Sequence, residues 1–432
     1  CEPLRKAVDN LKIRLSYGSL GNQQIGYYDF IQTITTKGSM SDYSFDGTVL
    51  GQHATVSDPV SGDQTWEKVV SKNLGLDLNM FNNRLSLTTD FYIRDTKGIL
   101  GKGKSLPSIY GASEPQMNAN NLRTKGYELV LGWRDSFKLA GSTFSYGITG
   151  TFSDYTAEYT KCDNPTGLIG DPYVGKKYGE IWGYKVDGLF RNDKEAAEYA
   201  SRIDLSTVAS GYYTATGAYG KGVRGGDIKY LDLNGDNIVN GGKGTLDDPG
   251  DRRVIGNSSP RYQYGASLNF SWYGFDVSVF MQGIGRLDWY PGADNLRFWG
   301  PYCRPYATFV PKNFMSQVWS EENPDAYFPR ARAYTSLNSN SGTAYYTNDR
   351  YLQNLAYCRL KNLTIGYTIP RRLTSKVGIK ECRIYFSGEN LATWSALKSD
   401  FLDPEQAAAD SDKKANVYPW CKTYSIGLNL TF

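Results

Sequence analysis

The chain has 432 residues, and 48 Lys and Arg against 44 Asp and Glu leave a formal net charge of only +4. So small an excess excludes the strongly basic surface of a nucleic-acid-binding protein, and a single His (His53) excludes a His-rich metal site. No run approaches the roughly 18 apolar residues of a membrane helix. An excess of Tyr (34) and Gly (46), with only 5 Met, favours β-structure.

Ten segments alternate apolar residues with small or polar ones, which is the period-2 pattern of strands that have one apolar face. In chain order they span residues 11–18, 73–80, 85–93, 127–133, 144–152, 262–272, 275–281, 363–369, 382–386 and 424–432. The second face is rich in Gly, Ser, Thr and Asn, as expected for a water-filled lumen. Aromatic residues stand at segment ends (Tyr17, Trp133, Trp272, Tyr424 and Phe432), which is typical of interfacial girdles.

The connections between these segments alternate strictly between long and short. Long connections of about 55, 33, 110, 80 and 36 residues alternate with short turns at Asn82-Asn83, 134–143, Tyr273-Gly274 and 370–381. Outer-membrane barrels have long loops outside and short turns in the periplasm, whereas a soluble sandwich, the competing interpretation, has no such requirement. We therefore predict an all-β fold, a transmembrane antiparallel β-barrel wall of about ten strands with long extracellular loops, whose last residue faces the periplasm.

Seven stretches, in order along nearly the whole chain, carry a family resemblance. They are residues 11–23, 121–128, 179–190, 226–236, 251–262, 360–367 and 387–391. These stretches resemble recurrent motifs of SusC/RagA-type TonB-dependent transporters, and the run from Gly226 to Asp236 is the most specific.

The resemblance covers the C-terminal part of that family, whose barrels have about 22 strands around an N-terminal plug. It implies that residues 1–432 form one region, the last ten or so strands, and that the plug and the N-terminal barrel segment lie outside them. The stretch from Glu2 to Asn10 resembles the turn before a family strand. We therefore expect a chain break upstream of Cys1, against the alternative of a lipidated mature N-terminus.

The resemblance also implies a function, which is transport and not catalysis. It implies import of oligosaccharides or peptides across the Gram-negative outer membrane, driven by the TonB–ExbB–ExbD complex. The expected partners are a SusD-like surface lipoprotein and outer-membrane lipid, with no nucleic acid. Two alternatives stay open: a self-contained ten-strand outer-membrane pore, and a secreted calcium-stabilised glycan-binding β-protein. We find no P-loop, GxSxG or HExxH motif, so no catalytic residues are predicted.

Asp232, Asn234 and Asp236 have the 1-3-5 oxygen spacing of a calcium loop. The carbonyl of Ile238 would fill the seventh position, and Asp251 or Asp247 would close the shell. Two departures weaken the match, because Asn237 replaces the usual Gly and Lys243 the usual Glu. The competing interpretation is an Asp/Asn/Gly turn without an ion.

Aromatic residues are concentrated in the connection 282–362, namely Trp289, Trp299, Tyr302, Tyr306 and Trp319. Such rings stack on sugars or anchor protein interfaces, so they are candidates for contact with substrate or partner. Packing within an ordered outer loop is the alternative for most of them. Asn192-Asp193-Lys194-Glu195 before an Ala-rich run predicts a capped short helix.

Overall fold

The computed structural model describes residues 7–22, 31–37, 53–62, 64–102, 107–214, 222–303, 306, 310–332, 335–337, 342–399, 401–407 and 420–432. Cys1 and its surroundings lie outside these ranges. No helix within them is long and apolar enough to cross a membrane.

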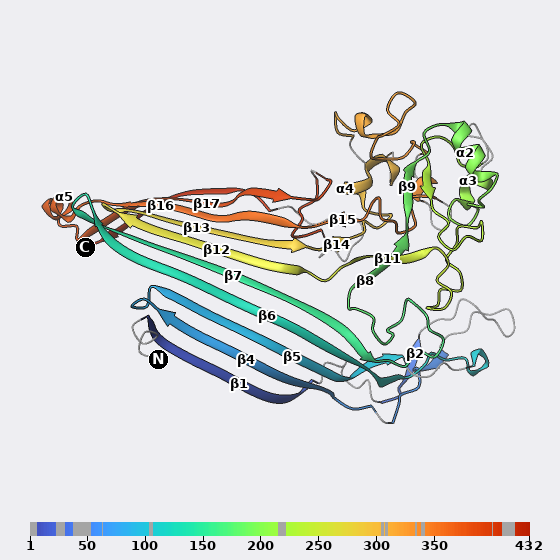
Figure 1. Ribbon diagram of the computed structural model, residues 1–432, viewed down its shortest axis with the longest axis horizontal. Coiled ribbons are helices and arrows are strands. Elements are labelled where there is room, and N and C mark those ends of the chain that lie inside the picture. Colours follow the sequence, from blue (N-terminus) through green and yellow to red (C-terminus); the bar gives the residue numbers. More distant parts are fainter. Residues whose placement is uncertain are drawn as a thin grey trace.

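The molecule is built on one ten-stranded sheet in which every neighbouring pair is antiparallel (Figure 1). In order across the sheet, its strands are β1 (Val8–Asn22), β4 (Glu67–Met80), β5 (Leu85–Lys102), β6 (Gln116–Leu139), β7 (Ser142–Lys161), β12 (Arg261–Trp272), β13 (Phe275–Arg286), β16 (Tyr357–Thr368), β17 (Glu381–Ser395) and β18 (Thr423–Thr431). Each of the ten predicted segments lies within or overlaps one of these strands, in the predicted order. The mostly-β architecture and the count of ten are therefore confirmed.

Several strands are longer than the alternating pattern predicted. Residues 134–143 were expected to form a turn, but β6 continues to Leu139 and β7 begins at Ser142, so only Ala140 and Gly141 turn the chain. The predicted turn at 370–381 contains two helical turns, α5 (Arg371–Thr374) and η5 (Ser375–Val377). Backbone pairing continues wherever a neighbouring strand is present, whereas the hydrophobic pattern marks only the part of a strand that has an apolar face.

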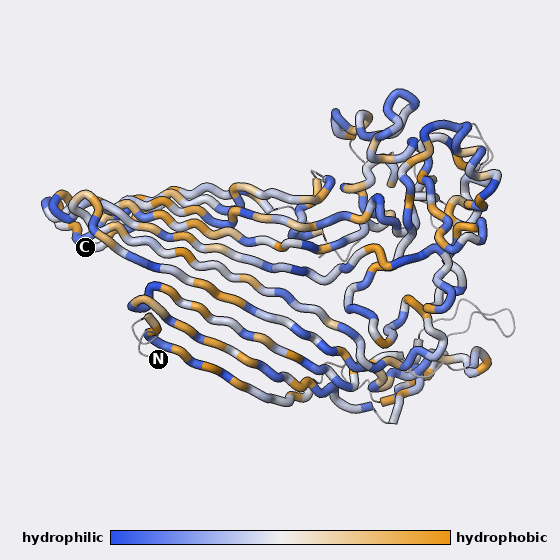
Figure 2. Tube along the Cα trace, viewed as in Figure 1, coloured by the Kyte–Doolittle hydropathy of each residue, from blue (hydrophilic) through white to orange (hydrophobic). Residues whose placement is uncertain are grey.

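The short turns gather at one end of the sheet and the long connections at the other (Figure 1). The start of β1 and the end of β18 lie at the short-turn end, because Val8 pairs with Met80 and Glu381 with Thr431. Figure 2 shows hydrophobic and hydrophilic residues alternating along the strands. The apolar face is bare in this chain, with Leu15 80% and Ile426 83% exposed. A large apolar face without protein cover indicates contact with lipid or another protein.

The long connections carry smaller elements at the far end of the sheet. Their strands are β2 (Ile34–Lys37), β3 (His53–Val56), β8 (Glu180–Tyr184), β9 (Val186–Leu189), β10 (Ile228–Tyr230), β11 (Arg252–Asn257), β14 (Asp288–Trp289) and β15 (Gln353–Asn354). Their helices are α2 (Asp193–Ala200), α3 (Ser210–Thr214) and α4 (Leu296–Trp299), with 3-10 turns η1 (Ser108–Tyr110), η2 (Gly300–Tyr302), η3 (Met315–Gln317) and η4 (Thr335–Leu337). The predicted capped helix is α2: the Asn192 side chain accepts the Glu195 N–H at 2.9 Å, and the Glu195 carboxylate accepts the Arg191 N–H.

The tight turn between β12 and β13 requires a glycine at position 274, and this requirement can be tested. Tyr273 and Gly274 both have positive φ (51° and 85°), as in a type I′ turn. A Cβ on Gly274 would lie 2.7 Å from the carbonyl oxygen of Thr368. We expect Gly274→Ala to lower the free energy of unfolding by about 1–2 kcal/mol, measured by chemical denaturation. Gly150→Ala is the control, because a Cβ there meets nothing within 4 Å; equal losses in both variants would contradict this explanation.

Candidate functional site

The long connections between β7 and β12 and between β13 and β16 pack together into one body, here called the loop layer. Its buried core is formed by residues from both connections, including Phe190, Tyr212, Tyr230, Val239, Trp299, Phe328 and Tyr351. Rings from distant parts of the chain meet there: Trp299 contacts Tyr351 at 5.0 Å between centroids, and Tyr302 stacks on Phe328 at 5.8 Å. The loop layer is therefore an ordered structure with its own hydrophobic core rather than a set of separate loops.

The five aromatic candidates fall into two groups in this layer. Trp299, Tyr302 and Trp319 are buried in the core, with Trp299 fully so. Burial raises the pKa of the Tyr302 hydroxyl, which donates to the Pro329 carbonyl at 2.5 Å. Tyr306 is 83% exposed, and Trp289 on β14 is half-buried. Packing accounts for the first group, and contact with substrate or partner stays a prediction that is best directed at Tyr306 and Trp289.

A buried ion pair joins the two connections of the loop layer. The Arg332 guanidinium donates to the Asp227 carboxylate at 2.6 Å, and both side chains are almost completely buried. The guanidinium carbon of Arg332 also lies 4.2 Å from the centroid of the Tyr212 ring. Burial raises the pKa of Asp227 to about 6, although Arg332 opposes this shift. The residues are 105 positions apart in the chain, so the sequence carried no local signal for the pair.

The predicted calcium loop forms a series of tight side-chain turns. The Asp232 carboxylate accepts the N–H groups of Gly235 at 2.7 Å and Asn237 at 2.9 Å, and Asp236 accepts the Ile238 N–H at 2.8 Å. Asn237, which stands in place of the usual Gly, has a φ of 65°. Asn tolerates this left-handed conformation better than most residues, so that departure does not disrupt the loop.

Asp251 has a different role from the one predicted. Its carboxylate is fully buried and accepts the N–H groups of Leu233, Asn234 and Asn240. It ties the two ends of the loop together from the inside. Within the described ranges, no three His, Cys, Asp or Glu side chains are grouped so that they could hold a metal ion. The loop therefore offers two carboxylates, the Asn234 amide oxygen and the Ile238 carbonyl, and calcium binding stays a prediction.

The polar face of the sheet carries charges in cross-strand pairs. Arg14 on β1 donates to Asp77 on β4 at 3.0 Å and to Asp90 on β5 at 2.8 Å. The Arg14–Asp90 pair passes over Gly75, where a Cβ would come within 2.6 Å of both side chains. Arg383 and Asp276 form a similar pair with a shortest contact of 2.5 Å. The charges of Arg14, Asp77 and Asp90 are thus paired within the sheet.

A second set of ion pairs joins residues 401–407, which follow β17, to the same sheet. Arg359 on β16 is 1% exposed and donates to Asp403 at 2.5 Å and to Glu405 at 2.6 Å. Lys361 also donates to Glu405 at 2.7 Å. Residues 401–407 are therefore held against β16 rather than extending from the sheet. Sequence reasoning missed this contact, because nothing local distinguishes Asp403 and Glu405 from solvated loop acids.

Asp227 provides a pH-dependent test of the loop layer. Its pKa is raised in the folded protein, so the folded state holds a proton that the unfolded state has already released between about pH 4 and pH 6. Stability from this group should therefore fall as pH rises through that interval. We expect Asp227→Asn to remove this dependence and, at neutral pH, to lower the free energy of unfolding by about 3–5 kcal/mol, because Arg332 is left buried without a counter-ion.

Thermal unfolding of the wild type and Asp227→Asn across pH 4–8 checks this expectation. Asp325→Asn, a change to another loop acid, is the control. An unchanged pH profile in Asp227→Asn would refute the assignment.

Comparison with known proteins shows which proteins this chain is similar to. The chain is 26% identical over 98% of its length to TonB-dependent receptor P3 and 27% identical to TonB-dependent receptor P26, both of Formosa agariphila. It is 22% identical over 98% of its length to TonB-dependent receptor SusC of Bacteroides thetaiotaomicron. The chain spans only about 40% of the length of these relatives. No protein-family model matches it.

Solved structures agree on the fold. The chain superposes on the RagAB peptide transporter with a TM-score of 0.68 at 21% identity, covering 99% of this chain and 41% of the other. The RagAB peptide importer in its open-open state gives 0.66 at 22% identity. The ten-stranded sheet aligns with part of the RagA barrel. Along nearly its whole length the chain is therefore similar to the C-terminal two fifths of TonB-dependent receptors of SusC/RagA type, which are transporters rather than enzymes.

Proposed function

We propose that this chain forms the C-terminal part of the barrel wall and outer loops of a TonB-dependent importer in the outer membrane. The observation that carries the proposal is the match along 98% of the chain to TonB-dependent receptors, in a sheet that aligns with the RagA barrel. The turn-end location of the β18 terminus supports a periplasmic C-terminus. The plug, the preceding strands and the contact with the TonB–ExbB–ExbD complex would come from outside these residues.

The two edges of the sheet support an incomplete barrel over a self-contained pore. In the described part of the chain, β1 pairs only with β4 and β18 only with β17, so the sheet does not close on itself. Open edges cannot face lipid, because their N–H and C=O groups would lack hydrogen-bond partners. Further strands from the same receptor would pair with both edges. A secreted glycan-binding protein is disfavoured by the bare apolar face.

The solved relatives suggest the substrate and partner. The RagAB structures are those of a peptide transporter and importer. By analogy, we propose that the loop layer receives a peptide or oligosaccharide that is delivered by a SusD-like surface lipoprotein. An ordered loop layer with its own aromatic core suits this role, because a rigid rim is required for a lid to dock in one position.

Exposed and buried aromatic residues should respond differently to truncation. We expect Tyr306→Ala to reduce uptake or partner binding several-fold without changing the unfolding temperature, because its ring is exposed. Trp299→Ala should destabilise the loop layer by about 3–5 kcal/mol. Uptake of labelled peptides and oligosaccharides into cells, with and without TonB, and co-purification of the lipoprotein provide the measurements.

Tyr110→Ala is the matched control, since that ring is also exposed but lies outside the connection 282–362. Uptake that persists without TonB would refute the proposed function. Equal effects of Tyr306→Ala and Tyr110→Ala would refute the role of Tyr306.

We also propose that the Asp232 loop binds calcium weakly, with the ion ordering the loop layer. Asp232, Asn234 and Asp236 supply hard oxygens, but the fully engaged Asp251 leaves the shell to be completed by water. Calcium should raise the unfolding temperature of the wild type by a few degrees and leave Asp232→Ala unchanged, measured by calorimetry. Asp187→Asn is the control, and absence of any calcium effect on the wild type would refute the site.

A further inference from the structure

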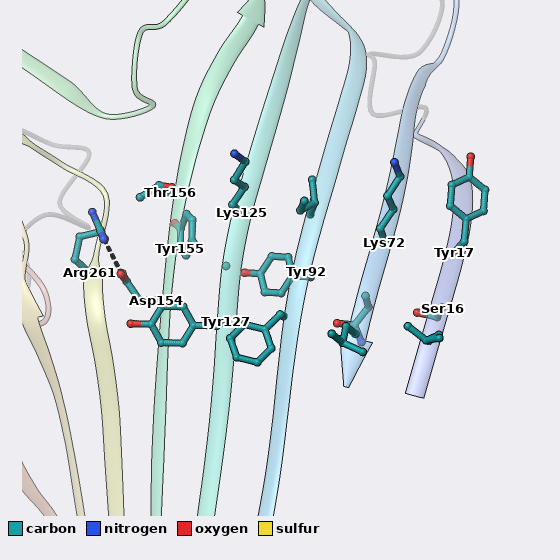
Figure 3. A pocket seen from close by; sticks show the side chains of 16 residues that line it. Ser16, Tyr17, Lys72, Tyr92, Lys125, Tyr127, Asp154, Tyr155, Thr156 and Arg261 are labelled. Atoms are coloured by element: carbon teal, nitrogen blue, oxygen red, sulfur yellow. Dashed lines mark hydrogen bonds and ion pairs between the residues drawn. The ribbon is translucent and has the colours of Figure 1, made fainter. Parts of the chain in front are cut away.

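A groove of about 810 Å³ crosses the apolar face of the sheet between β1 and β12 (Figure 3). Its lining includes Leu15, Tyr17, Lys72, Leu74, Phe91, Ile93, Lys125 and Tyr127. The polar face, with the Arg14 network, is on the other side of the same strands. Nothing in the transport function proposed above uses this groove.

The strand register shows how the groove is formed. Leu15, Leu74, Phe91 and Tyr127 lie opposite one another on four adjacent strands. A second row, two residues further along, contains Tyr17, Lys72, Ile93 and Lys125. Residues two apart on a strand share a face, so both rows project to the apolar side. The intervening row points to the polar face, and its backbone forms the floor between two ridges of side chains.

Two ammonium groups on this surface have no carboxylate within ion-pair distance in the described part of the chain. Within the described residues, Lys72 and Lys125 form no ion pair, and both are exposed. The neighbouring carboxylates are already engaged, Asp95 by Arg123 at 2.7 Å and Asp154 by Arg261 at 2.6 Å. The four cations and two carboxylates named in this paragraph together carry a net charge of +2.

Two rows further out on this face, beyond Val70 and Asp95, there is more positive charge. Lys68 lies directly opposite Lys97 there. Like charges directly opposite each other across a strand pair are destabilising unless an anion lies between them.

The position of the two lysines along their strands corresponds to the level of the lipid headgroups in a membrane. Counted from Met80 at the turn end of β4, Lys72 is the ninth residue, and a strand needs about 9–11 residues to cross the bilayer. In Figure 3 the side chains of Tyr17, Lys72 and Lys125 extend together towards the loop end of the strands. Lysines do this when they place their charge at the membrane surface and their methylenes against lipid.

We propose that this groove binds an anionic lipid of the outer leaflet. Its acyl chain would lie along Leu15, Leu74 and Phe91, and its phosphate would sit between Lys72 and Lys125. The two lysines are on strands separated only by β5, about 10 Å apart at the backbone, so one phosphorylated headgroup reaches both. A second copy of the chain is the competing occupant, but an apolar interface would bury both ammonium groups, whereas a phosphate neutralises them.

The inference rests on the membrane placement proposed above, but its test measures lipid binding and can fail without affecting transport. The complete receptor that carries this chain is purified in non-ionic detergent and titrated with diphosphorylated lipid A and with its dephosphorylated form, using native mass spectrometry. We expect the double variant Lys72→Gln/Lys125→Gln to bind the phosphorylated lipid roughly tenfold or more weakly. The dephosphorylated lipid should bind the wild type as weakly as the phosphorylated lipid binds the variant.

Lys12→Gln/Lys138→Gln is the matched control, because it removes the same charge from the polar face. Heat-dependent migration on denaturing gels verifies that each variant is folded. Undiminished binding in Lys72→Gln/Lys125→Gln, or an equal loss in the control, would overturn the proposal. A change from dimer to monomer in light scattering, with lipid binding intact, would assign the groove to a second copy and also overturn it.

Discussion

The structure depends on one constraint, which is that every backbone N–H and C=O in the sheet must find its partner on the next strand. In a lipid environment no water is present to take the place of a missing partner, so the strands have to be continuous and consecutive. The eight inner strands, each paired on both sides with antiparallel neighbours in chain order, satisfy this constraint, and short turns join the strands at one end. All of the irregular chain is then displaced to the other end, where the loop layer forms.

The same constraint separates the chemistry of the two faces. Away from the few register shifts, successive side chains along a strand point to opposite faces of the sheet. On the polar face, opposite charges meet across strands, as Arg14 does with Asp77 and Asp90. A small residue between them, Gly75, allows the Arg14–Asp90 pair to bridge two strands. On the apolar face, large side chains remain exposed in this chain.

Local signals in the sequence predicted most of the sheet. Alternation is a property of neighbouring residues, and turns such as Tyr273-Gly274 need particular backbone conformations, so both could be found without the fold. The ends of β6 and β7 were misplaced because pairing extends beyond the alternating part. The capped helix α2 was predicted correctly for the same reason as the turns: Asn192 and Glu195 are only three residues apart.

The loop layer was much less predictable. The pair Asp227–Arg332 and the set Arg359–Asp403–Glu405 join residues far apart in the chain. Composition flagged the aromatic residues of the connection 282–362, but it does not distinguish the buried ring of Trp299 from the exposed ring of Tyr306. Asp251 has the right side chain for a metal ligand, yet three backbone amides use it to close the loop. The residue type indicates what a side chain can do, but its contacts in the folded structure determine what it does.

The two faces also differ in how their charges are neutralised, and Lys72 and Lys125 on the apolar face are the exceptions. Charges of the polar face, such as Arg14 and Arg383, are matched by carboxylates on nearby strands, so the sheet neutralises them itself. Lys72 and Lys125 have no ion-pair partner in the described part of the chain, and the carboxylates near them belong to Arg123 and Arg261. A charge on a lipid-facing surface becomes more costly with depth, and is tolerated near the headgroups. Their place at the outer end of the apolar band, with both side chains turned towards the loop end, supports the proposal that a lipid phosphate of the membrane pairs with them.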